Sequence, residues 1–198
     1  MPHTHGRLPL KLLRQFRTTG RDLSEAGLVS SNSGNISARC RGGIVITRHD
    51  STLAHLEEDD LIEVAFGASS HPPASVELIV HQAIYEATPA LAVVHAHPPS
   101  AIALSLALAT DRIEVVDLAS TLLGIVPIIE ANAVSGSQAL ANAMRDALRR
   151  SRIALVRGHG SFAVGETLAE ACEWTRRLEE TCRTLLSTDR SSEERDVR

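Results

Sequence analysis

Two long stretches of the chain place apolar residues at helical intervals. In residues 8–26, Leu and Phe recur on one face among Arg and Lys, which predicts an amphipathic helix ending at Gly27. Residues 168–186 show the same pattern. Residues 188–198 are polar and charged, so we expect a frayed tail there. Shorter helices are predicted at 76–86, 100–109 and 138–150.

Short apolar or alternating runs predict β-strands between these helices. The first three follow one another through polar turns and are expected to pair antiparallel; they are 36–38, 43–47 and 61–66. Later strands are expected at 90–94, 125–130, 153–156 and 162–165, with a loop or short helix at 118–123. A core built mainly from Leu, Ile, Val and Ala suits an α/β fold.

Length and composition support one such domain. The chain has 198 residues, enough for one well-packed core, which we expect to span residues 1–187. Aromatic residues make up only 3%, so Leu, Ile, Val and Ala must fill the core. The formal net charge of -4 and the lack of a sustained basic run argue against nucleic-acid binding.

Cysteine usage and the apolar runs bear on location. Cys40, Cys172 and Cys182 form no Cys-x-x-Cys pair, and their odd number leaves a free thiol, as in a reducing cytosol. The first residues lack the apolar core of a signal peptide, and the apolar run at 101–109 is too short to cross a bilayer. We therefore expect a soluble, cytoplasmic protein with no membrane partner.

Two histidines at a strand end suggest a metal site. His95 and His97 are two residues apart, so in a strand their side chains share one face. Pro98 and Pro99 follow and end the strand. Two adjacent imidazoles can bind one metal ion. The alternative is that one histidine is a core residue and the other lies in a loop.

A third histidine and a glutamate extend this candidate site. His159 follows another strand and lies between two glycines. Three imidazoles are a ligand set of catalytic zinc sites, although manganese, iron or cobalt remain possible. Glu77 could exchange a proton with a bound substrate. Alternatively, Ser75 caps the helix and the negative charge of Glu77 in its first turn interacts favourably with the helix dipole. Glu77 could also pair with His81, four residues later on the same helix face.

Two polar loops could bind an anion. Residues 30–35 contain Ser, Asn and Gly, whose amides and hydroxyls can approach an anion closely. Arg48 begins a second polar loop and could hold a phosphate or carboxylate. Each feature also has a simpler explanation, an ordinary turn in the first case and a surface arginine in the second.

Five motifs in order resemble one known family over about residues 8–187. They are Ser33-Gly34-Asn35-Ile36-Ser37, Ile46-Thr47, Ser75-Val76-Glu77, Val94-His95-Ala96-His97 and Arg157-Gly158-His159-Gly160. With the long C-terminal helix after them, they resemble the class II aldolase/adducin-head family, and most of all its L-fuculose-1-phosphate aldolase-type enzymes.

The resemblance implies a three-layer α/β/α fold with a mostly antiparallel central sheet. It implies one divalent metal ion, normally zinc, on His95, His97 and His159, with Glu77 as ligand or catalytic acid/base. The metal would act as a Lewis acid that stabilises an enediolate. The implied partner is a small sugar phosphate, and the implied assembly is a homotetramer with sites near subunit interfaces. The phosphate would be held by residues at Asn32, Gly34, Asn35, Thr47, Arg48 and Ser75.

The chain also departs from the family pattern. Arg48-His49-Asp50 stands where many relatives have Pro-Thr-Gly, and Val76 replaces the second serine of a pair. The stretch 130–133 lacks the tyrosine of fuculose-phosphate aldolase, and the only tyrosine is Tyr85.

Three functions remain open. The first is cleavage of a ketose 1-phosphate to dihydroxyacetone phosphate and an aldehyde. The second is a related metal-dependent epimerase, dehydratase or decarboxylase acting on a sugar phosphate or sugar acid. The third is a non-catalytic adducin-like module.

Overall fold

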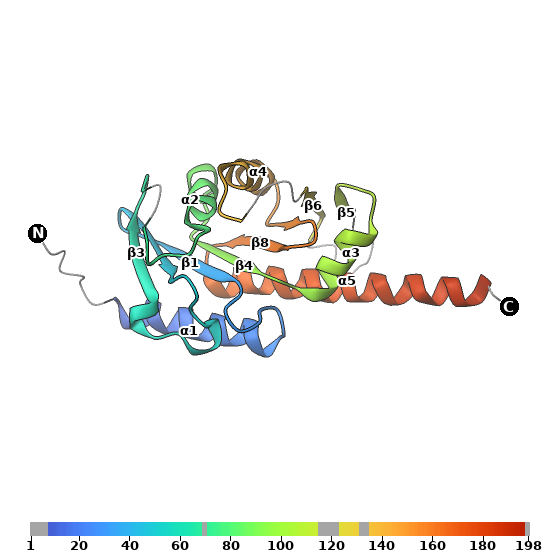
Figure 1. The fold of residues 1–198 in the computed structure, drawn as a ribbon, viewed down its shortest axis with the longest axis horizontal. Helices are drawn as coiled ribbons and strands as arrows, with labels where there is room; N and C mark the ends of the chain where they lie inside the picture. The colour runs from blue at the N-terminus through green and yellow to red at the C-terminus, as the bar shows by residue number, and fades with distance from the viewer. Residues whose placement is uncertain (1–7, 69–70, 115–122, 131–134, 197–198) are drawn as a thin grey trace, which may run out of the picture.

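The computed structural model describes residues 8–68, 71–114, 123–130 and 135–196. The described residues form one eight-stranded sheet in the order β3-β2-β1-β4-β8-β7-β6-β5 (Figure 1). The strands are β1 (Asn35–Cys40), β2 (Gly43–Thr47), β3 (Leu61–Ala65), β4 (Ala92–Ala96), β5 (Arg112–Glu114), β6 (Ile125–Ile129), β7 (Ile153–Val156) and β8 (Gly160–Gly165). The helices are α1 (Leu10–Glu25), α2 (Leu78–Ala87), α3 (Pro99–Ala107), α4 (Gln138–Leu148) and α5 (Leu168–Asp196), with short 3-10 turns η1 (Leu53–His55) and η2 (Glu58–Asp60).

The sheet is mostly antiparallel. Among the described strands, β6 and β7 are the one parallel pair, and the other neighbours run antiparallel. β4 lies between β1 and β8, so Asn35 pairs with His95, and His95 pairs with Phe162. The expected α/β class and the antiparallel pairing of the first strands are confirmed.

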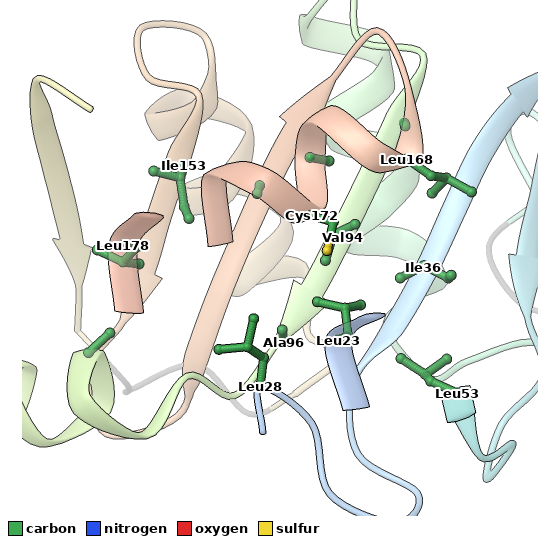
Figure 2. Packing of buried hydrophobic residues seen from close by; sticks show 14 of the residues in the cluster. Leu23, Leu28, Ile36, Leu53, Val94, Ala96, Ile153, Leu168, Cys172 and Leu178 are labelled. Atoms are coloured by element: carbon green, nitrogen blue, oxygen red, sulfur yellow. The ribbon is translucent and has the colours of Figure 1, made fainter. Parts of the chain in front are cut away.

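One face of the sheet packs against α1 and α5 (Figure 1). Figure 2 shows this core, in which Leu23 of α1 and Leu168 of α5 approach Ile36 and Val94 of the sheet. The predicted apolar stripe of α1 is confirmed, since Leu13, Phe16 and Leu23 are all buried. This layer therefore supports β4, the strand that contains His95, on the α1 and α5 side of the sheet.

The other face packs against α2 and α4 (Figure 1). Alternation along β4 assigns each residue to a side: Val94 and Ala96 belong to the α1 and α5 core, whereas Val93 belongs to the α2 and α4 core. His95 has the same parity as Val93 and stacks on Phe162, which is also in the second core. The candidate site therefore lies on the α2 side of the sheet.

Most predicted boundaries lie within two residues of those in the structure, and three differences have a clear reason. The helix predicted from 76 begins at Leu78, because Glu77 at its N-cap has a non-helical conformation, with φ -88° and ψ 11°. The sequence pattern does not predict β5. This strand has three residues, of which only Ile113 is buried, so its sequence shows no clear alternation of apolar and polar residues. The helix expected to end at 186 continues to Asp196, and the Arg and Glu residues common in this stretch have high helix propensities.

The remaining expectations about the chain have mixed outcomes. Residues 118–122 of the expected loop or short helix lie outside the described residues. The odd number of cysteines predicts at least one free thiol, and in the structure Cys40, Cys172 and Cys182 are all free. In the part of the chain that the structure describes, every helix is too short or too polar to span a membrane.

Candidate metal centre

Three histidines from two segments meet at one end of the sheet. His95 is near the end of β4, His97 lies just beyond it, and His159 lies in the turn between β7 and β8. The Nε2 atoms of His95 and His97 are 3.0 Å apart, and all three candidate ligand atoms lie within 4.8 Å of one another. The structure thus brings together the three histidines that the sequence singled out. They could hold one metal ion.

His95 is fixed with one ring nitrogen free for a ligand. Its Nδ1 lies 3.0 Å from the backbone oxygen of Ser161, so this nitrogen carries the proton and donates to the carbonyl. The Nε2 lone pair then faces the other two histidines. The ring stacks on Phe162 at a centroid distance of 4.2 Å. Metal-binding histidines commonly donate a hydrogen bond from their other ring nitrogen to a backbone carbonyl, which fixes the orientation of the ring.

Gly160 allows the two histidine segments to approach closely. A Cβ atom at this position would lie 2.5 Å from the Ala96 oxygen and 2.6 Å from Cδ2 of His97. Any side chain would therefore push β4 and the His159 turn apart. The close packing of these two segments therefore requires glycine at position 160, directly after His159.

The environment of His97 and His159 favours their neutral, metal-binding form. Burial, followed by the neighbouring His95 and His159, lowers the pKa of His97 to about 4. Burial and His95 also lower the pKa of His159. Both imidazoles are consequently neutral near pH 7, and a neutral imidazole is the form that binds a metal. The chemistry of this donor set fits zinc or another divalent transition metal.

Glu77 lies directly against the histidines. Its Oε2 accepts a hydrogen bond from Asn35 Nδ2 at 2.9 Å and lies 3.2 Å from His95 Nε2. Its Oε1 accepts from Ser135 Oγ at 2.7 Å. Burial alone would raise the pKa of Glu77, but His95 and the hydrogen bonds from Asn35 and Ser135 outweigh it and lower the pKa to about 2. The carboxylate is therefore ionised at neutral pH.

The alternative pairing of Glu77 with His81 is not what the structure shows. His81 is fully buried, and its Nδ1 lies 2.6 Å from the hydroxyl of Ser37. Tyr85 is also buried on this helix, and its hydroxyl donates to the Ser37 backbone oxygen. Both residues pack inside the protein, and neither lines the pocket described next.

A pocket opens in front of the histidines and carries most of the predicted anion-binding residues. Asn32, Gly34, Asn35, Arg48 and Ser75 all line it. The rest of its lining is Ser33, His49, Asp50, Val76, Glu77, His95, His97, Ser135 and His159. The two polar loops and the three histidines therefore share one cavity.

Two of the predicted phosphate residues have structural roles. Thr47 is fully buried and is not among the lining residues; its Oγ1 accepts a hydrogen bond from the Ile36 amide at 3.2 Å. Ser75 lines the pocket, but its Oγ accepts from the Glu77 amide at 3.3 Å rather than capping a helix turn. Asn35 also supports Glu77, as described above.

The second loop orients its charged groups in different directions. Arg48 donates through Nε to the Asp59 carbonyl at 3.1 Å, which leaves its terminal amino groups available to a ligand. Asp50 lies 3.4 Å from His49 Nε2 and has a left-handed φ of 61°. The negative charge of Asp50 in the pocket therefore lies next to the His49 imidazole, which is not one of the three candidate metal ligands.

Sequence reasoning missed Ser135. Its hydroxyl touches Glu77 although the two residues are 58 positions apart. A single serine before a glycine looks like any turn residue, and no spacing linked it to Glu77. Only the packing of the segment before α4 against the turn before α2 reveals the contact.

The fold and the pocket define a class of protein: a mixed α/β protein with a candidate metal centre of three histidines and a carboxylate at a strand end. The particular family follows from comparison with known sequences. Residues 14–186 match the Class II Aldolase and Adducin N-terminal domain, and the chain belongs to this family.

Several relatives show what the chain is similar to. It is 34% identical over 184 residues to a methylthioribulose-1-phosphate dehydratase of Acidiphilium cryptum, covering 84% of each chain. It is 30% identical over 166 residues to a 5-methylthioribulose-1-phosphate/5-deoxyribulose-1-phosphate aldolase of Escherichia coli, covering 80% of this chain and 76% of the relative. The crystal structure of L-fuculose-1-phosphate aldolase from Thermus thermophilus superposes with a TM-score of 0.88 at 38% identity, covering 93% of this chain and 97% of that one.

One relative is much longer. The chain is 29% identical over 205 residues to a probable bifunctional methylthioribose-1-phosphate isomerase/methylthioribulose-1-phosphate dehydratase of Nocardia farcinica. The match covers 94% of this chain but 37% of that protein. The similarity therefore concerns one part of the bifunctional protein.

Proposed function

We propose that this chain is a divalent-metal-dependent lyase that cleaves a ketose 1-phosphate to dihydroxyacetone phosphate and an aldehyde. The observation that carries the proposal is the meeting of three imidazole ligand atoms and the Glu77 carboxylate in one pocket. Membership of the class II aldolase family and the similarity to two aldolases support the same chemistry.

The proposal includes the expected cofactor and assembly. We infer one Zn²⁺ ion per chain, with Mn²⁺, Fe²⁺ or Co²⁺ as other metals that suit the same donors. We also infer a cytoplasmic homotetramer with sites near subunit interfaces and a three-layer α/β/α domain at 1–187. Helices on both faces of the sheet support the layered arrangement.

Each group in the pocket has a role in this reaction. His95, His97 and His159 would hold the ion, which when bound supplies Lewis acidity toward a substrate oxygen. Glu77 is ionised and can take the hydroxyl proton that the substrate must lose before its carbon–carbon bond breaks. Arg48 and the backbone around Gly34 would bind the phosphate at the other end of the pocket.

Dehydration is the second candidate, favoured by the 34% identity to a methylthioribulose-1-phosphate dehydratase. Aldol cleavage between C3 and C4 removes the proton of the C4 hydroxyl. Dehydration removes the C3 proton and expels the C4 hydroxyl as water. Both reactions need an acid/base group near the same carbon atoms, so the residues of the pocket are compatible with either.

The deciding experiment is product analysis on protein of known metal content. Elemental analysis should find about one divalent ion per chain. The protein is then incubated with a panel of ketose 1-phosphates, including 5-deoxyribulose 1-phosphate, with and without chelator. We expect chelator-sensitive release of dihydroxyacetone phosphate. A product lighter by one water would instead identify a dehydratase, and protein with neither metal nor turnover would support the non-catalytic module.

Arg48 gives a test of the phosphate end of the pocket. Arg48→Ala should raise KM for a phosphorylated substrate by about 10–100-fold, because a hydrogen bond to a charged group contributes about 1.5–3 kcal/mol. kcat should change little if the contact is equally strong in the ground and transition states. Steady-state kinetics measure both constants.

Arg41 provides the matched control for this variant. It is exposed in the turn between β1 and β2 and does not line the pocket. Arg41→Ala should leave KM unchanged. An Arg48→Ala protein with the KM of the Arg41→Ala protein would assign Arg48 to the surface rather than to the substrate.

A further inference from the structure

The segment before α4 is built to reach the turn that carries Glu77. Gly136 has a left-handed φ of 70°, and a Cβ atom there would lie 2.4 Å from the Val76 backbone oxygen. Only glycine permits this approach without displacement. On its other side the segment is anchored by Ser137, whose hydroxyl accepts from the Leu140 amide and caps α4. Ser135 is thereby placed beside Glu77.

The two oxygens of the Glu77 carboxylate have different surroundings. Oε2 accepts from Asn35 Nδ2 at 2.9 Å and faces His95 Nε2 at 3.2 Å. Oε1 accepts from Ser135 Oγ at 2.7 Å. Two donors on opposite oxygens fix the plane of the carboxylate, because rotation of the group would break both hydrogen bonds.

Ser135 also connects a buried group to the pocket. Glu77 is only 2% exposed, whereas Ser135 is an exposed residue and both line the same cavity. Oε2 already accepts from Asn35 and faces His95. Oε1 is therefore the oxygen that remains for a substrate hydroxyl, and its direction depends on Ser135.

We propose that Ser135 is a positioning residue of the active site, whose hydroxyl holds Oε1 of Glu77 toward the substrate. This inference rests on the proposed function, since it gives Glu77 a substrate to act on. The serine acts through Glu77 and needs no contact with the metal ligands. Its loss should therefore affect turnover more than metal binding or substrate affinity.

The test compares three variants of the full chain. Ser135→Ala removes the hydroxyl, and Ser135→Thr keeps it. Ser137→Ala is the matched control, because Ser137 lies two residues away and caps α4 without touching Glu77. For each protein we would measure metal content, melting temperature, kcat and KM, and solve a high-resolution crystal structure of the Ser135→Ala protein and of the unaltered protein.

The expected results separate positioning from folding. Ser135→Ala should lower kcat by about 10–100-fold, the scale of a misplaced catalytic group, with KM and metal content unchanged. Ser135→Thr should recover most of the turnover. Ser137→Ala should lower the melting temperature and keep kcat. In the crystals, the Glu77 carboxylate should occupy one orientation in the unaltered protein and rotate in Ser135→Ala.

Other outcomes would overturn the inference. Unchanged kcat in Ser135→Ala, equal losses in Ser135→Ala and Ser135→Thr, or loss of metal in Ser135→Ala would each do so. If the unaltered protein turns over none of the ketose phosphates, the proposed function fails separately. The crystal comparison then still decides whether Ser135 orients Glu77, since an unmoved carboxylate in Ser135→Ala contradicts the inference without any assay.

Discussion

His95→Ala should abolish metal binding and turnover together. His95 is the buried member of the cluster, and its ring centroid lies 4.8 Å from that of His97 and 5.1 Å from that of His159. Two remaining imidazoles make a weak site. Losing a residue that only supports a ligand lowers metal affinity by up to about 100-fold, so losing a ligand itself should lower it by more than about 100-fold. Elemental analysis after dialysis and an activity assay on the same sample measure the two effects.

His81→Ala is the matched control for this prediction. His81 is as buried as His95 but contributes no ligand atom to the cluster. It should lose stability through its broken contact with Ser37 and still bind metal. Full metal occupancy in His95→Ala would contradict the ligand assignment, whatever the activity.

The candidate site was predictable because its residues stand at strand ends. An alternating pattern placed His95 and His97 on one side of a strand, and flanking glycines marked His159 as a residue in a tight turn. Pairing of β4 with β8 brings these ends together. Local patterns thus located each histidine, and the sheet order, which no local pattern contains, explains their convergence.

Long-range packing limited the rest of the prediction. The family resemblance implied Thr47 as a phosphate ligand, but strand alternation turns it inward, where its hydroxyl accepts from the Ile36 amide. Ser135 looked like an ordinary turn residue, yet it reaches Glu77 across 58 positions of sequence. In both cases the side chain's role depends on which segment packs against it, and the sequence alone carried no sign of that partner.

Relatives with different reactions resemble this chain to a similar degree. An aldolase and a dehydratase of related ketose phosphates both match it at 30% identity or more. Binding a ketose phosphate and moving one proton are common to both reactions. Under the proposed function, what differs is the bond that breaks next, which would depend on how the substrate is oriented relative to Glu77.

Glu77→Gln should lower kcat by about 100-fold or more while the protein keeps its fold and its metal. The amide has nearly the same shape as the carboxylate. Its oxygen can still accept from Asn35, and the Ser135 hydroxyl can rotate to accept from the new amide. The amide cannot take up a proton at neutral pH, however, and general base catalysis typically contributes 10²–10⁴-fold, on the order of the loss expected here. Single-turnover kinetics on metal-loaded protein measure the chemical step directly.

Glu179→Gln is the matched control, since Glu179 is an equally buried carboxylate with a purely structural set of contacts. It accepts hydrogen bonds from the Ser100 and Ala101 amides and caps α3 from α5. This variant should be less stable and retain its single-turnover rate. A Glu77→Gln protein as active as Glu179→Gln would remove Glu77 from the chemistry, and the acid/base group would then have to be sought among the other residues that line the pocket.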